Sequence, residues 1–182
     1  MAASGDRERI DVTFPSGDAS CAAWLYLPAP GGKACASRPV VVLGHGLGAT
    51  RDMALDDVAE AFRAEGYACL VFDYRHFGDS GGRPRQLLDV ERELTDWASA
   101  IAYARSHPSC DPDRVVLWGS SFGGGHAITV ASRLLSSRRC ERAKPSTSSM
   151  RLSQSSGRLA PDRAASRRAS AWLSAQRTKS CS

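Results

Sequence analysis

A serine between glycines follows an apolar segment of the sequence. The stretch reads Gly119-Ser120-Ser121-Phe122-Gly123, and it comes directly after the apolar run VVLW. A G-x-S-x-G sequence between a strand and a helix holds its serine on a strained, tight turn. Ser121 would then be a nucleophile, and the Phe122 amide at the helix N-terminus would donate to an oxyanion. The alternative is a tight turn of glycine and serine without a chemical role.

A second glycine-rich loop comes earlier in the chain, after another apolar run. Gly44-His45-Gly46-Leu47-Gly48 follows PVVVL. An H-G-x-G loop at the end of a strand presents a second oxyanion donor, for which we expect the backbone amide of Leu47. The alternative is a glycine-rich turn without a role. The residues expected to support the two oxyanion donors and the nucleophile are Gly44, His45, Gly46, Gly119 and Gly123.

No histidine is well placed to take the proton of Ser121. The residues after Ser121 include one histidine, His126, and two acids, Glu141 and Asp162. On an α-helix His126 points about 140° away from Ser121, whereas proton abstraction needs an approach to about 3 Å. We therefore expect His126 to be an ordinary helix residue. His45 belongs to the other side of the predicted site, so we do not expect it to be the base either.

The two loops need a frame of strands and helices that brings them together. Unbroken β-branched runs are typical of strands buried on both faces, and apolar residues three and four apart indicate helices. Strands that alternate with helices imply parallel pairing, here after an initial antiparallel hairpin. The fold class is therefore α/β. The expected strands are 8–14, 19–27, 39–46, 68–74 and 111–120, and the expected helices are 53–67, 87–107 and about 122–135.

Several charged residues suggest structural roles rather than chemistry. The loop after the fourth expected strand has a cluster that we interpret as a turn held by pairing between aspartate and arginine. Charges on the helix 87–107 are expected to form a solvated face. The cysteines and histidines do not have zinc-ligand spacing, so we expect reduced thiols and no metal. The loop cluster is Asp73, Arg75, His76, Asp79 and Ser80, and the helix charges are Glu91, Arg92, Glu93 and Asp96.

The charge balance divides the chain near residue 132. Residues 1–132 have 12 Lys and Arg against 17 Asp and Glu, whereas 133–182 have 12 against two, together with 13 serines. Such a basic, serine-rich segment with few apolar residues cannot bury enough surface to offset its ordering entropy. We expect one folded domain over 1–132 and a disordered tail over 133–182.

Three motifs together resemble the α/β-hydrolase family, in its serine esterase, dienelactone-hydrolase-like and aminopeptidase-like branches. They are VVLGHGLGAT (41–50), FDYRHFGDSGG (72–82) and VVLWGSSFGGGH (115–126), and they occur in the order found in that family. The resemblance covers about residues 8–132 and implies a sheet of order 1-2-4-3-5-6-7-8, of which strands 1 to 5 are present here. It also implies hydrolysis of small-molecule esters, amides or related acyl compounds, without a metal or organic cofactor.

The same resemblance implies an acid and a histidine from loops after strands 7 and 8, which the sequence does not show. We therefore expect the N-terminal half of the fold, a partial sheet of order 1-2-4-3-5, and a catalytically incomplete site. Residues 114–118 would then form an exposed apolar edge that favours association. No apolar run approaches the length of a membrane span, and the N-terminal residues show no signal core, so we expect a cytoplasmic protein.

Two other functional classes stay open. The chain is alternatively a non-catalytic binding or regulatory module that uses the half-fold as a platform. The basic segment 133–182 would also attract polyanions without sequence preference. It has a single aromatic residue for stacking, Trp172, so we expect no specific nucleic-acid partner.

Overall fold

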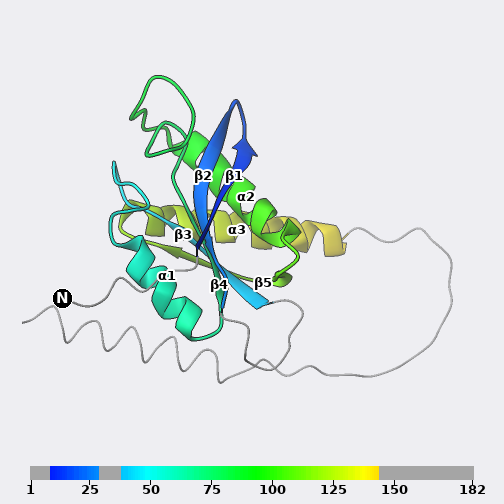
Figure 1. The fold of residues 1–182 in the computed structure, drawn as a ribbon. Coiled ribbons are helices and arrows are strands. Elements are labelled where there is room, and N and C mark those ends of the chain that lie inside the picture. The colour runs from blue at the N-terminus through cyan, green and yellow to red at the C-terminus, as the bar shows by residue number, and fades with distance from the viewer. Residues whose placement is uncertain (1–8, 29–37, 144–182) are drawn as a thin grey trace, which may run out of the picture. The chain divides into compact units, whose positions relative to one another are not determined.

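The computed structural model of the chain describes residues 9–28 and 38–143, with side chains as far as residue 136. All of these residues belong to one compact unit, Met1–Lys144. Five strands and three helices make up this part of the chain (Figure 1). They are β1 (Arg9–Ser16), β2 (Ala19–Tyr26), β3 (Arg38–Gly44), α1 (Leu55–Ala64), β4 (Ala68–Phe72), α2 (Val90–Ser106), β5 (Cys110–Gly119) and α3 (Phe122–Ala143).

The five strands form one mixed sheet in the order β1-β2-β4-β3-β5, which confirms the predicted order. β1 and β2 form the expected antiparallel hairpin, and β2 is antiparallel to β4. β3 is parallel to both of its neighbours, β4 and β5. The carboxyl ends of β3 and β5 therefore meet at one edge of the sheet, where Gly44 pairs with Gly119.

The centre of the sheet is buried on both faces, as the unbroken apolar run of β3 predicted. Val40 and Val42 pack into a core with α2 and α3, whereas Val41 and Leu43 pack into a second core with α1. All four side chains are fully buried. Burial of each stabilises the fold by about 1.5–3 kcal/mol. The three helices thus cover both faces (Figure 1), and β3 is fixed on either side.

The helices begin and end close to the predicted positions, with local reasons for each boundary. Gly66 adopts φ +89° just after α1, where only a glycine is unstrained, so the predicted stop is confirmed. The side chain of Asp89 accepts a hydrogen bond from the amide of Arg92 and caps α2, which starts later than predicted. α3 continues past residue 135 to Ala143.

The helix α3 crosses the boundary at residue 132 where composition changes. Residues 133–143 of the segment predicted to be disordered are helical. The remainder of that prediction, over 144–182, lies outside the described residues. Among the described helices, none has the length and apolar character needed to cross a bilayer.

Strand β5 lies at the edge of the described sheet, as predicted for residues 114–118. Within residues 9–28 and 38–143 its only neighbour is β3. The side chain of Val116 on this strand is 43% exposed. On α3, Ile128 and Leu135 are 74% and 70% exposed. An apolar strand with one free edge and an apolar helix surface beside it favour association.

Candidate active site

Ser121 lies on the turn between β5 and α3, with an unusual backbone conformation. Its φ is +50°, in the left-handed region that a non-glycine residue adopts at a cost of about 1–2 kcal/mol. The residue is exposed. The amides of Gly123 and Gly124 donate to the carbonyls of Ser120 and Ser121 and close the first turn of the helix. The turn therefore has the strain and exposure expected of a nucleophile.

The glycine loop after β3 lies directly against this turn. A Cβ added at Gly46 would lie 3.4 Å from the Cβ of Ser121, and the amide of Ser120 donates to the carbonyl of Gly44 at 3.2 Å. A Cβ at Gly123 would overlap the carbonyl oxygen of His45. Larger residues at these glycines would push the two loops apart. The structure thus brings together the two motifs that the sequence predicted to share a site.

The two predicted oxyanion donors belong to these loops. Phe122 is the first residue of α3, so its amide has no acceptor within the helix. The dipole of the helix adds a partial positive charge at the same end. Leu47 lies in the turn after β3 and is 61% exposed. Neither amide donates a hydrogen bond to an acceptor among the described residues, so both can donate to a ligand.

His45 is buried behind the loop and fully engaged. Its Nδ1 lies 2.9 Å from the carbonyl oxygen of Gly46, and the amide of Tyr74 donates to its Nε2 at 3.4 Å. Nδ1 therefore carries the proton and donates it to Gly46. Burial lowers the pKa of His45, although Asp73, 3.8 Å from Nε2, opposes that shift. A neutral imidazole held at both nitrogens supports the loop and cannot approach Ser121.

His126 is paired with Glu93, a carboxylate that we expected on the solvated face of the helix 87–107. Its Nε2 lies 2.6 Å from Oε2 of Glu93, and both side chains are buried. The prediction of a solvated face for Glu91, Arg92, Glu93 and Asp96 is wrong for Glu93 and Asp96. Glu93 lies four positions before Trp97 and Asp96 four positions before Ala100, so both fall at helical spacing with buried residues of α2, which was the signal in the sequence. His126 lies on α3, as expected, and is a buried partner of Glu93.

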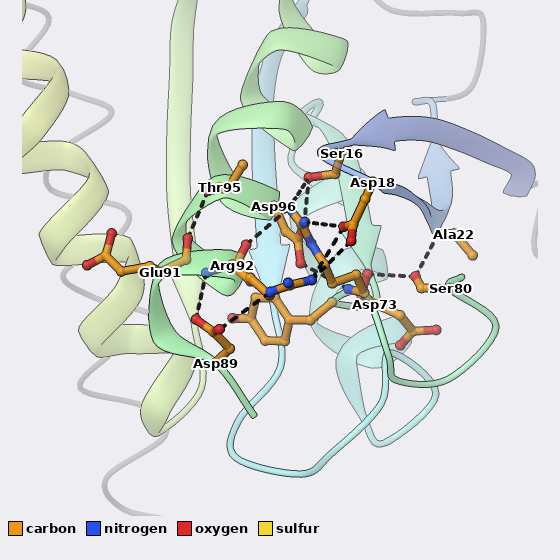
Figure 2. Close-up of polar contacts among 12 residues, drawn as sticks. Ser16, Asp18, Ala22, Asp73, Ser80, Asp89, Glu91, Arg92, Thr95 and Asp96 are labelled. Atoms are coloured by element: carbon orange, nitrogen blue, oxygen red, sulfur yellow. Dashed lines mark hydrogen bonds and ion pairs between the residues drawn. The ribbon is translucent and has the colours of Figure 1, made fainter. Parts of the chain in front are cut away.

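Arg75 organises a second buried network away from Ser121. Its amide and Nε donate to the two carboxylate oxygens of Asp96 at 2.9 and 2.8 Å. Ser16, at the end of β1, and Asp18, in the β1–β2 turn, also accept hydrogen bonds from its guanidinium. Figure 2 labels Ser16, Asp18 and Asp96. Burial alone would lower the pKa of Arg75, but the hydrogen bonds to Asp96 and Asp18 and the negative charge of Asp96 together outweigh burial, and the pKa is raised. Through Asp96 on one side and Ser16 and Asp18 on the other, Arg75 ties the β1–β2 hairpin to α2.

The aspartates of the loop after β4 pair with an arginine, as predicted, but not with the predicted Arg75. Their partner is Arg51, whereas Arg75 pairs with Asp96 and Asp18. Asp73 accepts hydrogen bonds from the amide and the guanidinium of Arg51 at 2.7 and 2.5 Å. Arg51 also pairs with Asp79 at 2.7 Å. Because Arg51 follows the glycine loop of β3, these contacts fix the far end of that loop. Arg51 was not among the predicted residues, and no local sequence pattern marks it.

The cysteines and the metal-ligating side chains of the described residues form no further part of the candidate site. Among the described residues, no three metal-ligating side chains gather in one place. Cys21, Cys69 and Cys110 are buried free thiols, and burial raises the pKa of Cys110 to about 11. All four histidines of the chain lie in the described part. None of them hydrogen-bonds to Ser121.

The sequence and fold match known proteins over most of the described region. The family described as serine aminopeptidase S33 matches residues 36–172. The quorum-quenching protein AidA of Acinetobacter baumannii is 57% identical over 123 residues, covering 68% of this chain and 39% of that protein. The thiohydrolase aneE of Aspergillus aculeatus is 38% identical over 96 residues, covering 53% of this chain and 30% of that protein.

Solved structures agree with this assignment. DcsB in complex with its substrate analogue has a TM-score of 0.63 and 28% identity, over 69% of this chain and 41% of that one. The α/β-hydrolase GrgF from Penicillium has a TM-score of 0.62 and 28% identity, over 68% of this chain and 41% of that one. This chain thus matches only 30–39% of the length of the two curated relatives. With the S33 match over most of its length, the chain belongs to the serine aminopeptidase S33 family of α/β-hydrolases.

Proposed function

We propose that Ser121 is the nucleophile of an acyl-transfer site that acts on a small-molecule carboxylic ester or a related acyl compound. The observation that carries the proposal is the exposed serine at φ +50° with the Gly46 loop against its Cβ. In the proposed reaction the Ser121 oxygen attacks the acyl carbon. The carbonyl oxygen becomes an oxyanion, which the amides of Leu47 and Phe122 bind.

The class of substrate is supported by the relatives and by the donors of the site. One relative is named a thiohydrolase and another a quorum-quenching protein. Two backbone amides beside a serine suit any carbonyl whose oxygen gains charge when it is attacked. Such a site uses neither a metal nor an organic cofactor. The choice among ester, thioester and amide depends on the leaving group.

We further propose that these 182 residues supply only the nucleophile half of the active site. A serine hydroxyl is a poor nucleophile until a base takes its proton. His45 and His126 are buried and engaged by Gly46 and Glu93. The base and its acidic partner would then come from outside this sequence.

The incomplete site leads to a prediction about activity. The chain alone should give only trace hydrolysis of p-nitrophenyl acetate, because base-assisted serine nucleophiles owe most of their rate to the base. Steady-state release of p-nitrophenol measures it. A turnover number of order 1 s⁻¹, lost in the Ser121→Ala variant, would contradict the proposal that the base is missing.

A chimera tests the nucleophile directly. The aligned 123-residue segment of AidA is replaced by the matching segment of this chain, and hydrolysis of the same ester is measured. We expect an active chimera that loses at least about 10³-fold in kcat in the Ser121→Ala variant. The neighbouring exposed serine provides the control, because Ser120→Ala should leave kcat within about threefold. A folded but inactive chimera would overturn the proposal.

We propose a cytoplasmic setting with a small-molecule substrate, without a specific nucleic-acid partner or a membrane. Three cysteines are buried free thiols in the described part of the chain, which suits a reducing compartment. A soluble reporter fusion followed by cell fractionation tests the location. Recovery of the fusion in the membrane or secreted fraction would contradict it.

A further inference from the structure

The first turn of α3 has little of its own to hold it in place. After Phe122 it consists of Gly123, Gly124 and Gly125, and each glycine inside a helix costs about 1 kcal/mol relative to alanine. Glycines also offer no side chains that could pack against a neighbouring element. The direction of this turn nevertheless sets the direction of the Phe122 amide. The side chains that can fix it are Phe122 itself and the next residue beyond the glycines, His126.

His126 connects this turn to α2. Its ring packs against the ring of Phe122 with centroids 4.5 Å apart, and its Nε2 lies 2.6 Å from the Glu93 carboxylate. Both partners of the pair are buried. Burial raises the pKa of the Glu93 carboxyl, against the opposing effect of the hydrogen bond with His126. Burying such a pair is costly unless its geometry is tight.

We propose that Glu93 and His126 are a positioning pair for the oxyanion hole. The pair holds the ring of Phe122, and through it the first turn of α3, so that the Phe122 amide points at the reacting carbonyl. This inference rests on the proposed function of Ser121 and adds two residues to it. Neither side chain contacts the substrate, and both act through Phe122.

A second ion pair joins the same two helices and provides a matched control. Glu91 on α2 and Arg133 on α3 lie 3.2 Å apart, but their side chains are 74% and 56% exposed. Exposed pairs of this kind contribute little, because water screens them. If a link between α2 and α3 were all that mattered, the two pairs would behave alike. The positioning role predicts that only the buried pair affects the turn at Ser121.

The test uses a cysteine at the nucleophile position as a reporter that needs no base. In the Ser121→Cys chain, a thiolate at the N-terminus of α3 is stabilised by the same amides that would bind the oxyanion. Its alkylation by iodoacetamide is followed from pH 6 to pH 10 by mass spectrometry of the peptide containing residue 121. We expect alkylation at pH 7 at least tenfold faster than that of free cysteine.

The buried pair is then removed in this background. Glu93→Leu should slow alkylation of residue 121 at pH 7 about tenfold, with rates that converge by pH 10, where every thiol is ionised. Loss of a negative charge alone would favour the thiolate and speed the reaction, so slowing is specific to a displaced turn. Glu93→Gln keeps an acceptor for His126 and should stay within twofold. The control Glu91→Leu should also stay within twofold.

Each outcome decides between the alternatives. If the thiol in Ser121→Cys reacts like free cysteine, the proposed function fails, and the positioning role, which rests on it, is overturned with it. If that thiol is activated but Glu93→Leu leaves its rate unchanged, the positioning pair is overturned. The buried Cys69 and Cys110 report on the core in the same samples. If Cys69 and Cys110 become labelled together with residue 121, the Glu93–His126 pair stabilises the whole domain. Its specific role at the turn between β5 and α3 is then overturned as well.

Discussion

Two glycines in the first turn of α3 should respond in opposite directions to the same substitution. A Cβ at Gly123 would overlap the carbonyl oxygen of His45 and lie 2.7 Å from that of Gly44. Both obstacles are backbone atoms, which cannot rotate away. A Cβ at Gly125 meets nothing within 4 Å. We therefore expect Gly125→Ala to stabilise the chain and Gly123→Ala to destabilise it.

The magnitudes follow from two effects. Both variants gain about 0.5–1 kcal/mol in helix propensity, because alanine loses less backbone entropy than glycine. Gly123→Ala also incurs overpacking, which costs about 1–3 kcal/mol. Because the propensity gain is common to both, the difference between the variants isolates the clash. The free energies of unfolding should differ by about 1–3 kcal/mol.

Urea denaturation followed by far-UV circular dichroism measures this difference. With a slope of about 1–3 kcal/mol per molar urea, the midpoints of the two variants should lie about 1 M apart. The unsubstituted chain should fall between them. If both variants shift in the same direction by similar amounts, the loop of His45 does not lie against Gly123, and the assembled site is refuted.

Three further predictions concern the network, the edge and the pH response. Asp96→Asn should lower the free energy of unfolding by about 3–5 kcal/mol because it removes the buried charge partner of Arg75 and leaves only the exposed Asp18. Asp18→Asn should leave the urea midpoint unchanged, and equal losses in the two variants would contradict the difference in burial. Val116→Lys should reduce the self-association measured by light scattering after size-exclusion chromatography, because a charge at the free edge of β5 opposes pairing with another chain. If the unsubstituted chain is already monomeric, the prediction that this edge favours association is contradicted. Because burial lowers the pKa of His45, the unfolded chain binds the proton first as the pH falls below about 6.5, so the free energy of unfolding should decrease over that window. An NMR titration that gives His45 a pKa of 6.5 or above would contradict this.

The frame of the site could be predicted because its signals are local. The run from Val40 to Leu43 has no polar residue, which in a soluble protein requires cover on both faces. The glycines of the two loops are needed for close approach of backbone, so their types and order indicate a turn before any contact is known. The sheet order followed from the resemblance to a family. The structure confirms that order.

The buried charges could not be predicted in the same way. Glu93 and Asp96 are acidic residues on a helix, and such residues are exposed unless they have partners. Their partners are His126 and Arg75, which lie 33 and 21 positions away in the sequence. Nothing in the sequence of α2 itself shows that His126 or Arg75 will contact these carboxylates. Their helical spacing to Trp97 and Ala100 indicates burial, but the rule for single charged residues points the other way.

The order of the strands explains why these residues could carry one half of a site. β3 and β5 are neighbours in the sheet, so residues 44–47 and 119–123 meet although they are far apart in the sequence. Everything that would bind an oxyanion is therefore assembled by β3, β5 and α3. The free edge of β5 is the side on which a continuing sheet would add further strands, and with them a base. In the proposed function, stabilisation of the oxyanion and activation of the nucleophile would thus be separable, and the cysteine reporter at residue 121 would measure the first without the second.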